Sequence, residues 1–319
     1  MRSSAGCPEG PPLAARATGV HGQRCSRRAA FVCVCAAALW LGSRAGADST
    51  GGGFTIEAQL EHAAFRTEGV PSVIVHAPRD FDAKRPLQLV VFLHGYTGCI
   101  PVLMGKGETH CRPHDPPQQG WDLGRHHDAA HTNTLFVVPQ LALMKRSGRP
   151  GTFGNRGGFR LFLEELLAGP ISSALGSTRT LRDVAGLHLV AHSAGYQTAI
   201  AILEQGGVTG LIKSVVLLDA LYGETPRFAR FVEAHAAAGL RFVSLSLDRG
   251  TPRKENRALL TRLRHSLGPE RVATTNAAEL ARTVAAHPIV IGTGIPPHRL
   301  LPATHLAELL RALQPGAAP

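Results

Sequence analysis

Apolar runs that alternate with amphipathic segments along most of the chain constrain its fold more than any other feature. Runs typical of buried strands lie at Leu87–Leu93, Thr134–Val138, Leu187–Ala191, Ser214–Leu218, Phe242–Leu247 and Pro288–Ile291, after two earlier strands at Phe54–Leu60 and Ser72–His76. Segments with helical spacing of apolar residues lie at Phe159–Leu167, Gln197–Glu204, Arg227–Ala238, Lys254–Leu267 and Thr304–Leu313. This alternation predicts one α/β domain over residues 54–316, with a single doubly wound, mostly parallel sheet and helices on both faces.

One of these strand ends carries a serine between small residues. The run that ends at Ala191 continues as His192-Ser193-Ala194-Gly195, and a helix follows. Ligands of parallel sheets bind at the carboxyl ends of the strands, so this position is suited to chemistry. Small neighbours permit a sharp strand-to-helix turn that raises the serine hydroxyl above the sheet. The alternative is an ordinary helix N-cap serine.

A second strand end carries a His-Gly pair, in the stretch His94-Gly95-Tyr96-Thr97-Gly98-Cys99. The serine turn resembles the G-x-S-x-G nucleophile elbow of α/β-hydrolases, although Ala191 stands where that family has its first glycine. The His-Gly stretch is similar to the oxyanion loop of the same family, in particular of secreted feruloyl esterases and polyhydroxyalkanoate depolymerases. The resemblance implies that Ser193 is the nucleophile and that the backbone N–H groups of Tyr96 and Ala194 form the oxyanion hole.

The general base of this family is a histidine after the last strand. His298 follows the run Pro288–Ile291 and precedes a helix that begins near Pro302, so it occupies that place. His305 is the rival, but it lies within the expected helix. His287 precedes the strand and would lie at the wrong end of the sheet.

Two aspartates that follow strands are candidates for the acid of the triad. Family topology usually places the acid after the later strand, which favours Asp248. The local sequence favours Asp219, because Arg249 and Arg253 predict a surface ion pair for Asp248. We expect Asp219 to orient His298 and keep Asp248 as the alternative.

With these residues, the resemblance implies a serine hydrolase that cleaves a small-molecule or polymeric carboxylic ester through an acyl-enzyme, without a metal or organic cofactor. A peptidase, amidase or acyltransferase on the same scaffold, or a non-catalytic binding protein, is an alternative, because the fold does not decide between them. The net charge of +11 is partly concentrated near the N-terminus and otherwise spread. We therefore expect a solvated basic surface and no nucleic-acid partner.

Residues 1–47 have the features of an export signal. Arginines precede the apolar run Ala29–Leu41, and Ala45 and Ala47 fit the small-residue pattern of signal cleavage. The run is shorter than the roughly 20 residues that a spanning helix needs, although a membrane anchor is the alternative. We expect cleavage after Ala47, a flexible leader over residues 48–53, and a periplasmic or secreted protein without a membrane span.

Only Cys99 and Cys111 remain once this segment is removed. In an oxidising compartment, two remaining cysteines predict one disulfide, and two free thiols are the alternative. His110 and His114 lie close by, but the spacing fits no common zinc-finger pattern, so we expect no metal site there.

The region from Gly105 to Gly158 is rich in glycine and proline and predicts a long substrate-side loop, with a short helix near Trp121–Ala130. Its histidines either shape specificity or are merely solvated; they are His110, His114, His126, His127 and His131.

Overall fold

The structure, a computed structural model, describes residues 53–294 and 298–314. The predicted export signal and residues 48–52 of the predicted leader lie outside the described residues. Among the helices of the described ranges, none has the length and apolar character needed to cross a membrane.

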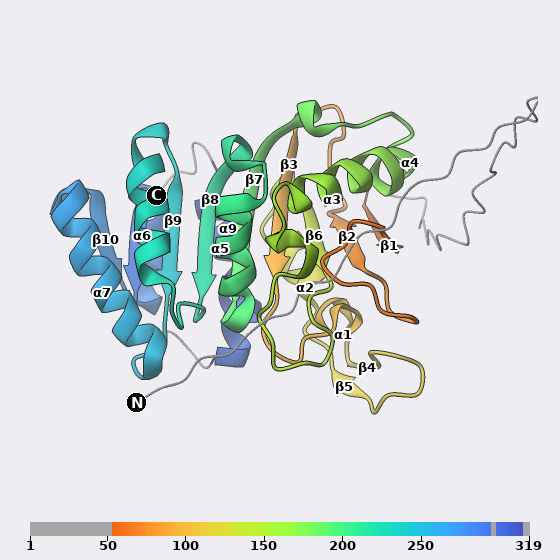
Figure 1. Ribbon diagram of the computed structural model, residues 1–319, viewed down its shortest axis with the longest axis horizontal. Coiled ribbons are helices and arrows are strands. Elements are labelled where there is room, and N and C mark those ends of the chain that lie inside the picture. Colours follow the sequence, from red (N-terminus) through yellow and green to blue (C-terminus); the bar gives the residue numbers. More distant parts are fainter. Residues whose placement is uncertain (1–52, 295–297, 315–319) are drawn as a thin grey trace, which may run out of the picture. The chain divides into compact units, whose positions relative to one another are not determined.

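The described residues form a nine-stranded sheet with the order β1-β2-β6-β3-β7-β8-β9-β11-β10 (Figure 1). Only the pairs β1–β2 and β2–β6 are antiparallel, and every other pair in the sheet is parallel. The prediction of a doubly wound, mostly parallel sheet is therefore confirmed. The strands are β1 Phe54–Ala58, β2 Val73–Ala77, β3 Leu87–Leu93, β6 Leu135–Pro139, β7 Val184–His192, β8 Ile212–Leu218, β9 Arg241–Leu245, β10 Val272–Thr275 and β11 Ile289–Gly292.

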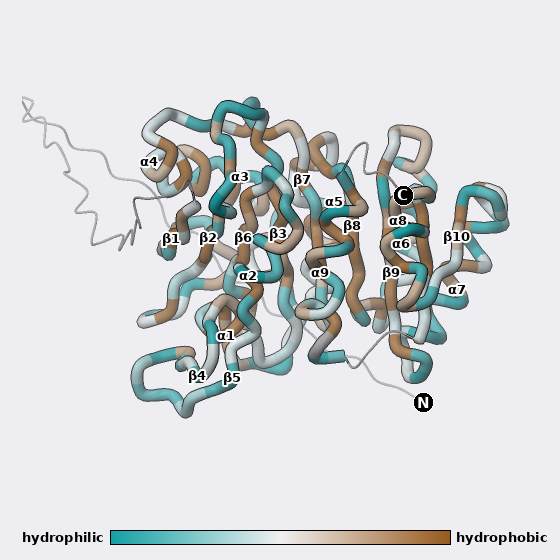
Figure 2. Tube along the Cα trace, turned by 180° about the vertical axis from the view of Figure 1, so that it is seen from behind, coloured by the Kyte–Doolittle hydropathy of each residue, from teal (hydrophilic) through white to brown (hydrophobic). Residues whose placement is uncertain are grey.

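Helices cover both faces of the sheet, and hydrophobic residues concentrate on the strands between them (Figure 2). Because successive strand residues point to opposite faces, Leu89 and Val91 enter one core while Val90 and Phe92 enter the other. The first core is covered by α3 Gly158–Leu166, α5 Tyr196–Gln205, α6 Thr225–His235 and α7 Gly250–Leu267. The second is covered by α1 Ile100–Met104, α2 Leu123–Asp128, α8 Leu280–Ala286 and α9 Leu301–Ala312, and the short α4 is Ser172–Leu175.

Two features depart from the sequence expectation. The edge strand β10 was not predicted, because its sequence V-A-T-T buries only Val272 and so contains no apolar run. A small hairpin of β4 Glu108–Thr109 and β5 Gln118–Gln119 lies in the long loop. The short helix expected near Trp121–Ala130 is confirmed as α2, and the helix expected near Pro302 is confirmed as α9.

Candidate active site

Ser193 occupies the turn between β7 and α5. The strand ends at His192, and a short 3₁₀ turn over Ser193–Gly195 leads into the helix. Ser193 has a φ of 53°, in the left-handed region that non-glycine residues rarely adopt. Such a conformation costs on the order of 1–3 kcal/mol and persists only where the surrounding structure enforces it. The turn therefore has the strain of a nucleophile elbow.

Two glycines allow the ends of β3 and β7 to approach closely at this turn. A Cβ atom on Gly195 would lie 2.2 Å from the backbone oxygen of Leu93, and one on Gly95 would lie 2.5 Å from the Cβ of Ser193. Ala191, the departure from the family motif, is fully buried in β7. The need for small residues thus concerns Gly95 and Gly195, while alanine is accommodated at the first motif position.

His298 faces Asp219, which directly follows β8. The His298 Nδ1 atom lies 2.5 Å from Asp219 Oδ2, and the side chain of Asp219 is only 2% exposed against 35% for His298. The same carboxylate accepts a hydrogen bond from the Leu247 N–H at 3.3 Å and from the Tyr222 hydroxyl at 3.4 Å. Burial, together with Asp219, raises the pKa of Tyr222 to about 12, so this hydroxyl is a donor at neutral pH. The buried carboxylate therefore accepts hydrogen bonds from fixed donors and lies beside the imidazole Nδ1 atom.

The alternative residues lie elsewhere. Asp248 is exposed, and within the described ranges it forms no ion pair with Arg249 or Arg253, so the predicted surface ion pair is wrong. His305 lies in α9 and pairs with Glu308 on the same helix. His287 precedes β11, at the opposite end of that strand from His298. The structure thus brings His298 to Asp219 and not to Asp248.

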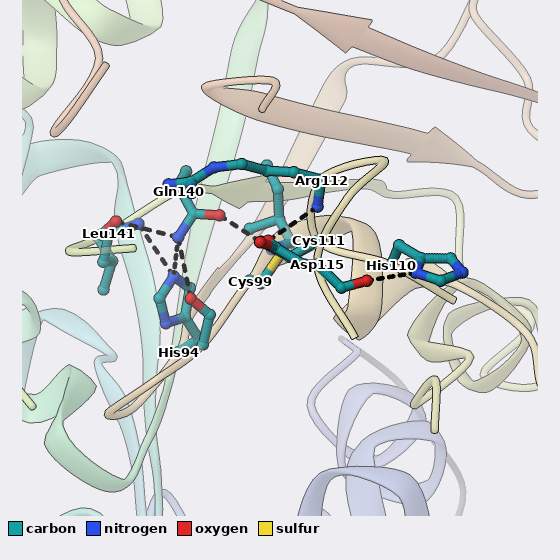
Figure 3. The surroundings of a disulfide bond; sticks show 10 residues. His94, Cys99, His110, Cys111, Arg112, Asp115, Gln140 and Leu141 are labelled. Atoms are coloured by element: carbon teal, nitrogen blue, oxygen red, sulfur yellow. Dashed lines mark hydrogen bonds between the residues drawn. A yellow bond between two sulfur atoms is a disulfide. The ribbon is translucent and has the colours of Figure 1, made fainter. Parts of the chain in front are cut away.

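The loop after β3 is held by the buried side chain of His94. Its Nε2 atom accepts the Leu141 N–H at 3.0 Å and lies 3.1 Å from the side-chain nitrogen of Gln140 (Figure 3). Its Nδ1 atom lies 2.9 Å from the Gly95 carbonyl oxygen, to which it donates. Burial lowers the pKa of His94 to about 4, so the ring is neutral and its tautomer is set by these bonds. Nothing in the sequence singled out Gln140 for this role.

Tyr96 and Ala194, the two residues expected to form the oxyanion hole, each lie where a backbone N–H group is left available to a ligand. The Tyr96 N–H has no hydrogen-bond acceptor within the part of the chain that the structure describes. Ala194 lies in the turn that starts α5, where N–H groups have no intrahelical acceptor. Both N–H groups are therefore suited to donating hydrogen bonds to a ligand oxygen at the carboxyl ends of the strands.

A cavity of about 530 Å³ lies at the carboxyl ends of the parallel strands, and its wall includes Ser193, His298 and Tyr96. This volume is in the range of small-molecule sites. Its other wall residues include Trp121 and the two arginines Arg146 and Arg299. The Arg299 guanidinium lies 6.0 Å from the centroid of the Trp121 ring, within reach of a cation–π contact. The cavity thus combines aromatic and positively charged surface.

His192, next to the serine, was not expected to have a role of its own. Its Nε2 atom donates to the His298 backbone oxygen at 2.9 Å, and the centroids of the two rings are 4.5 Å apart. Its ring also meets Trp121 edge-on at 5.5 Å. Burial lowers the pKa of His192 to about 3, so the ring remains neutral. His192 therefore links the serine turn to the segment that carries His298.

The predicted disulfide between Cys99 and Cys111 is present, with the two Cα atoms 5.8 Å apart (Figure 3). It joins the start of α1 to the long loop, and Cys99 lines the cavity. The loop contributes Gln118, Trp121 and Arg146 to the cavity wall, but none of its five histidines. Of the two alternatives for these histidines, a merely solvated side chain is wrong for His127, which is fully buried.

Comparison with known proteins finds likeness in structure alone. No family model matches the chain, and no curated protein does. A mutant of the feruloyl esterase module from Clostridium thermocellum, complexed with sinapinate, aligns over 85% of this chain and 93% of its own length, with 9% identity and a TM-score of 0.52. A structure described as FAE aligns over 80% and 94%, with 10% identity and a TM-score of 0.48. The strand order, the serine turn and the likeness to the esterase module together show that this chain has the α/β-hydrolase fold.

Proposed function

We propose that the protein is a serine hydrolase that cleaves a carboxylic ester. Ser193 is the nucleophile, His298 the general base and Asp219 the orienting acid, and the backbone N–H groups of Tyr96 and Ala194 are the oxyanion hole. The observation that most supports this proposal is the buried Asp219 carboxylate, 2.5 Å from His298, beside a cavity that Ser193 also lines.

The proposed reaction uses these residues in two steps. His298 takes the hydroxyl proton as Ser193 Oγ attacks the acyl carbon, and Asp219 stabilises the imidazolium that forms. The tetrahedral oxyanion accepts hydrogen bonds from the two backbone N–H groups, and one such donor contributes about 3 kcal/mol in the transition state. The alcohol leaves with the proton from His298. Water then attacks the acyl-enzyme with His298 as base, which releases the acid and restores Ser193.

The cavity wall indicates what kind of ester fits. Tyr96 and Trp121 offer aromatic surface, which suits a planar acyl or alcohol group. Arg146 and Arg299 add positive charge, which favours a substrate with an anionic group near the ester. The structural likeness to a feruloyl esterase module supports an aromatic acyl ester as the first substrate to try.

We also propose that the protein is exported to the periplasm or the cell exterior. The Cys99–Cys111 disulfide supports this location, because disulfides persist in oxidising compartments. Sequencing the N-terminus of the protein recovered from the exported fraction tests it, with Asp48 as the expected first residue.

Kinetics on paired ester and anilide substrates test the proposed reaction. We expect Ser193→Ala to lower kcat/KM for p-nitrophenyl esters on the order of 10⁴–10⁶-fold while circular dichroism stays unchanged. Ser177→Ala, an exposed serine that precedes β7 and so lies before the opposite end of that strand from the turn, is the control and keeps full activity. Near-native activity of Ser193→Ala would overturn the serine mechanism. Faster cleavage of the anilide would indicate an amidase or peptidase. Transfer of the acyl group to an added alcohol in preference to water would indicate an acyltransferase.

A further inference from the structure

A second cluster of histidine and carboxylate side chains lies away from the cavity. His76, on β2, pairs in register with Phe136 near the start of β6, at the edge of the sheet opposite to the carboxyl ends of the parallel strands. His127 and Asp128 are the last two residues of α2, which packs over this part of the sheet. One ligand atom from each of His76, His127 and Asp128 lies within 4.8 Å of the others. None of the three is a wall residue of the active-site cavity.

His127 carries a ring nitrogen that has no partner in the part of the chain that the structure describes. The side chain is fully buried and stacks on Phe136, with the ring centroids 5.1 Å apart. Its Nε2 atom lies 2.7 Å from the Thr134 hydroxyl, which in turn lies 2.9 Å from the Thr132 hydroxyl. The Nδ1 atom is buried and has no hydrogen-bond partner within the described residues.

The hydrogen bonds of His127 indicate which nitrogen carries the proton. Thr134 can donate to Thr132 and accept from Nε2–H, whereas a proton on Nδ1 would be a buried donor without an acceptor, which costs free energy. Nδ1 therefore presents a buried lone pair, which is what a metal ion binds.

His76 and Asp128 are the other two members of this cluster. The His76 Nε2 atom lies 2.8 Å from Asp128 Oδ1, and its Nδ1 atom lies 3.0 Å from the Thr55 hydroxyl. Without an ion, His76 Nε2–H donates to Asp128. A bound cation would displace this proton, and the Nδ1–H tautomer would then donate to Thr55 and present Nε2 as a ligand. Each imidazole thus has a threonine oxygen as partner of one ring nitrogen and keeps the other for a ligand, as metal-binding histidines usually do.

We propose that His76, His127 and Asp128 bind one Zn²⁺ ion. Two imidazoles and one carboxylate are a common ligand set for Zn²⁺, whereas Ca²⁺ and Mg²⁺ prefer oxygen ligands alone. Tetrahedral Zn²⁺ holds its ligand atoms about 3.4 Å apart, so small side-chain shifts close the site. The side chain of Asp128 is 40% exposed, which leaves room for water as the fourth ligand. Such an ion would link α2 to β2, away from the active-site cavity.

Calorimetric titration of the chelator-treated exported protein, which begins at Asp48, with ZnCl₂ tests this site. We expect one equivalent to bind, with affinity reduced at least about 10-fold by His76→Gln and by Asp128→Asn, since even outer-shell partners of a metal contribute 10–100-fold. His126→Gln, a half-buried histidine next to the site, is the matched control and keeps full affinity. A crystal soaked in ZnCl₂ should show an anomalous peak between His76, His127 and Asp128.

Three outcomes would overturn the proposal. They are the absence of stoichiometric binding, binding that Asp128→Asn leaves unchanged, and an anomalous peak elsewhere, for example at His298. Because Asp128 is partly exposed, Asp128→Asn carries the test even if His76→Gln does not fold. Hydrolysis of p-nitrophenyl esters by zinc-free Asp128→Asn should equal that of the unmodified protein.

Discussion

Two histidine–aspartate pairs lie at opposite ends of the parallel strands, and they differ in which of the two side chains is buried. In the pair His298–Asp219, the carboxylate is 2% exposed and the histidine 35%, whereas in His76–Asp128 the histidine is 16% exposed and the carboxylate 40%. A buried carboxylate held by fixed donors can orient an imidazole that faces a cavity. A buried imidazole beside an open carboxylate is better suited to holding an ion. The distance between the two side chains alone therefore does not identify the chemistry.

The largest expected effect separates the two pairs by activity. Asp219→Asn should lower kcat/KM about 10⁴-fold, because the amide favours the wrong imidazole tautomer of His298. Asp128→Asn, at the opposite edge, should change kcat/KM less than about twofold, and so should the exposed Asp248→Asn, since surface charges contribute little. Steady-state kinetics on one ester for all three variants checks this. A large loss in Asp248→Asn would restore the usual family position of the acid.

The next effect concerns histidines that have no carboxylate partner. Burial lowers the pKa to about 4 in His94 and His188 and to about 3 in His192, below the value of 6.5 of an unperturbed histidine. The unfolded chain therefore binds more protons below pH 6.5, and the folded state loses stability as the pH falls from there toward 4. We expect a loss on the order of 1–2 kcal/mol for each histidine between pH 7 and pH 5. Urea unfolding at both pH values measures it, and a more stable protein at pH 5 would contradict it.

The disulfide stabilises the chain beside the cavity, at the end of the strands opposite to His76. Replacing Cys99 and Cys111 together by serine should lower the free energy of unfolding by about 3 kcal/mol, as expected for a short closed loop. Because Cys99 lines the cavity, KM for the ester should also rise, while binding of Zn²⁺ at the far edge should be unchanged. Thermal unfolding and kinetics of the double variant, compared with the single Cys111→Ser protein, check both effects. An unchanged Tm would show that the loop is held by its other contacts.

The smallest effect concerns how His298 is positioned. His192→Phe keeps an aromatic ring beside His298 but removes the hydrogen bond to its backbone oxygen. We expect kcat to fall about 10–100-fold with little change in KM, because a displacement of about 1 Å has effects of this size. His188→Phe, a buried histidine of the same strand that bonds Ser214 instead, is the control and should affect stability more than kcat. Equal losses of kcat in both variants would make His192 a purely structural residue.

Much of this arrangement could be predicted from the sequence, because it follows the strands. Ser193 and Asp219 directly follow apolar runs, and parallel strands bring such ends to one edge. The edge strand β10 could not be predicted, because a strand with one buried residue has no apolar pattern. The cluster of His76 and His127 was also missed. Its members come together only through the antiparallel pairing of β2 with β6 and the packing of α2, which no local pattern reports.

Covalent labelling tests the nucleophile most directly. The purified protein is treated with a fluorophosphonate probe, and the labelled peptide is mapped by mass spectrometry. We predict one equivalent of label on Ser193, none in Ser193→Ala, much slower labelling in Asp219→Asn and an unchanged rate in Asp128→Asn. Absence of labelling in the folded protein, or a label on any other residue, would contradict the assignment of Ser193 as the nucleophile of a serine hydrolase.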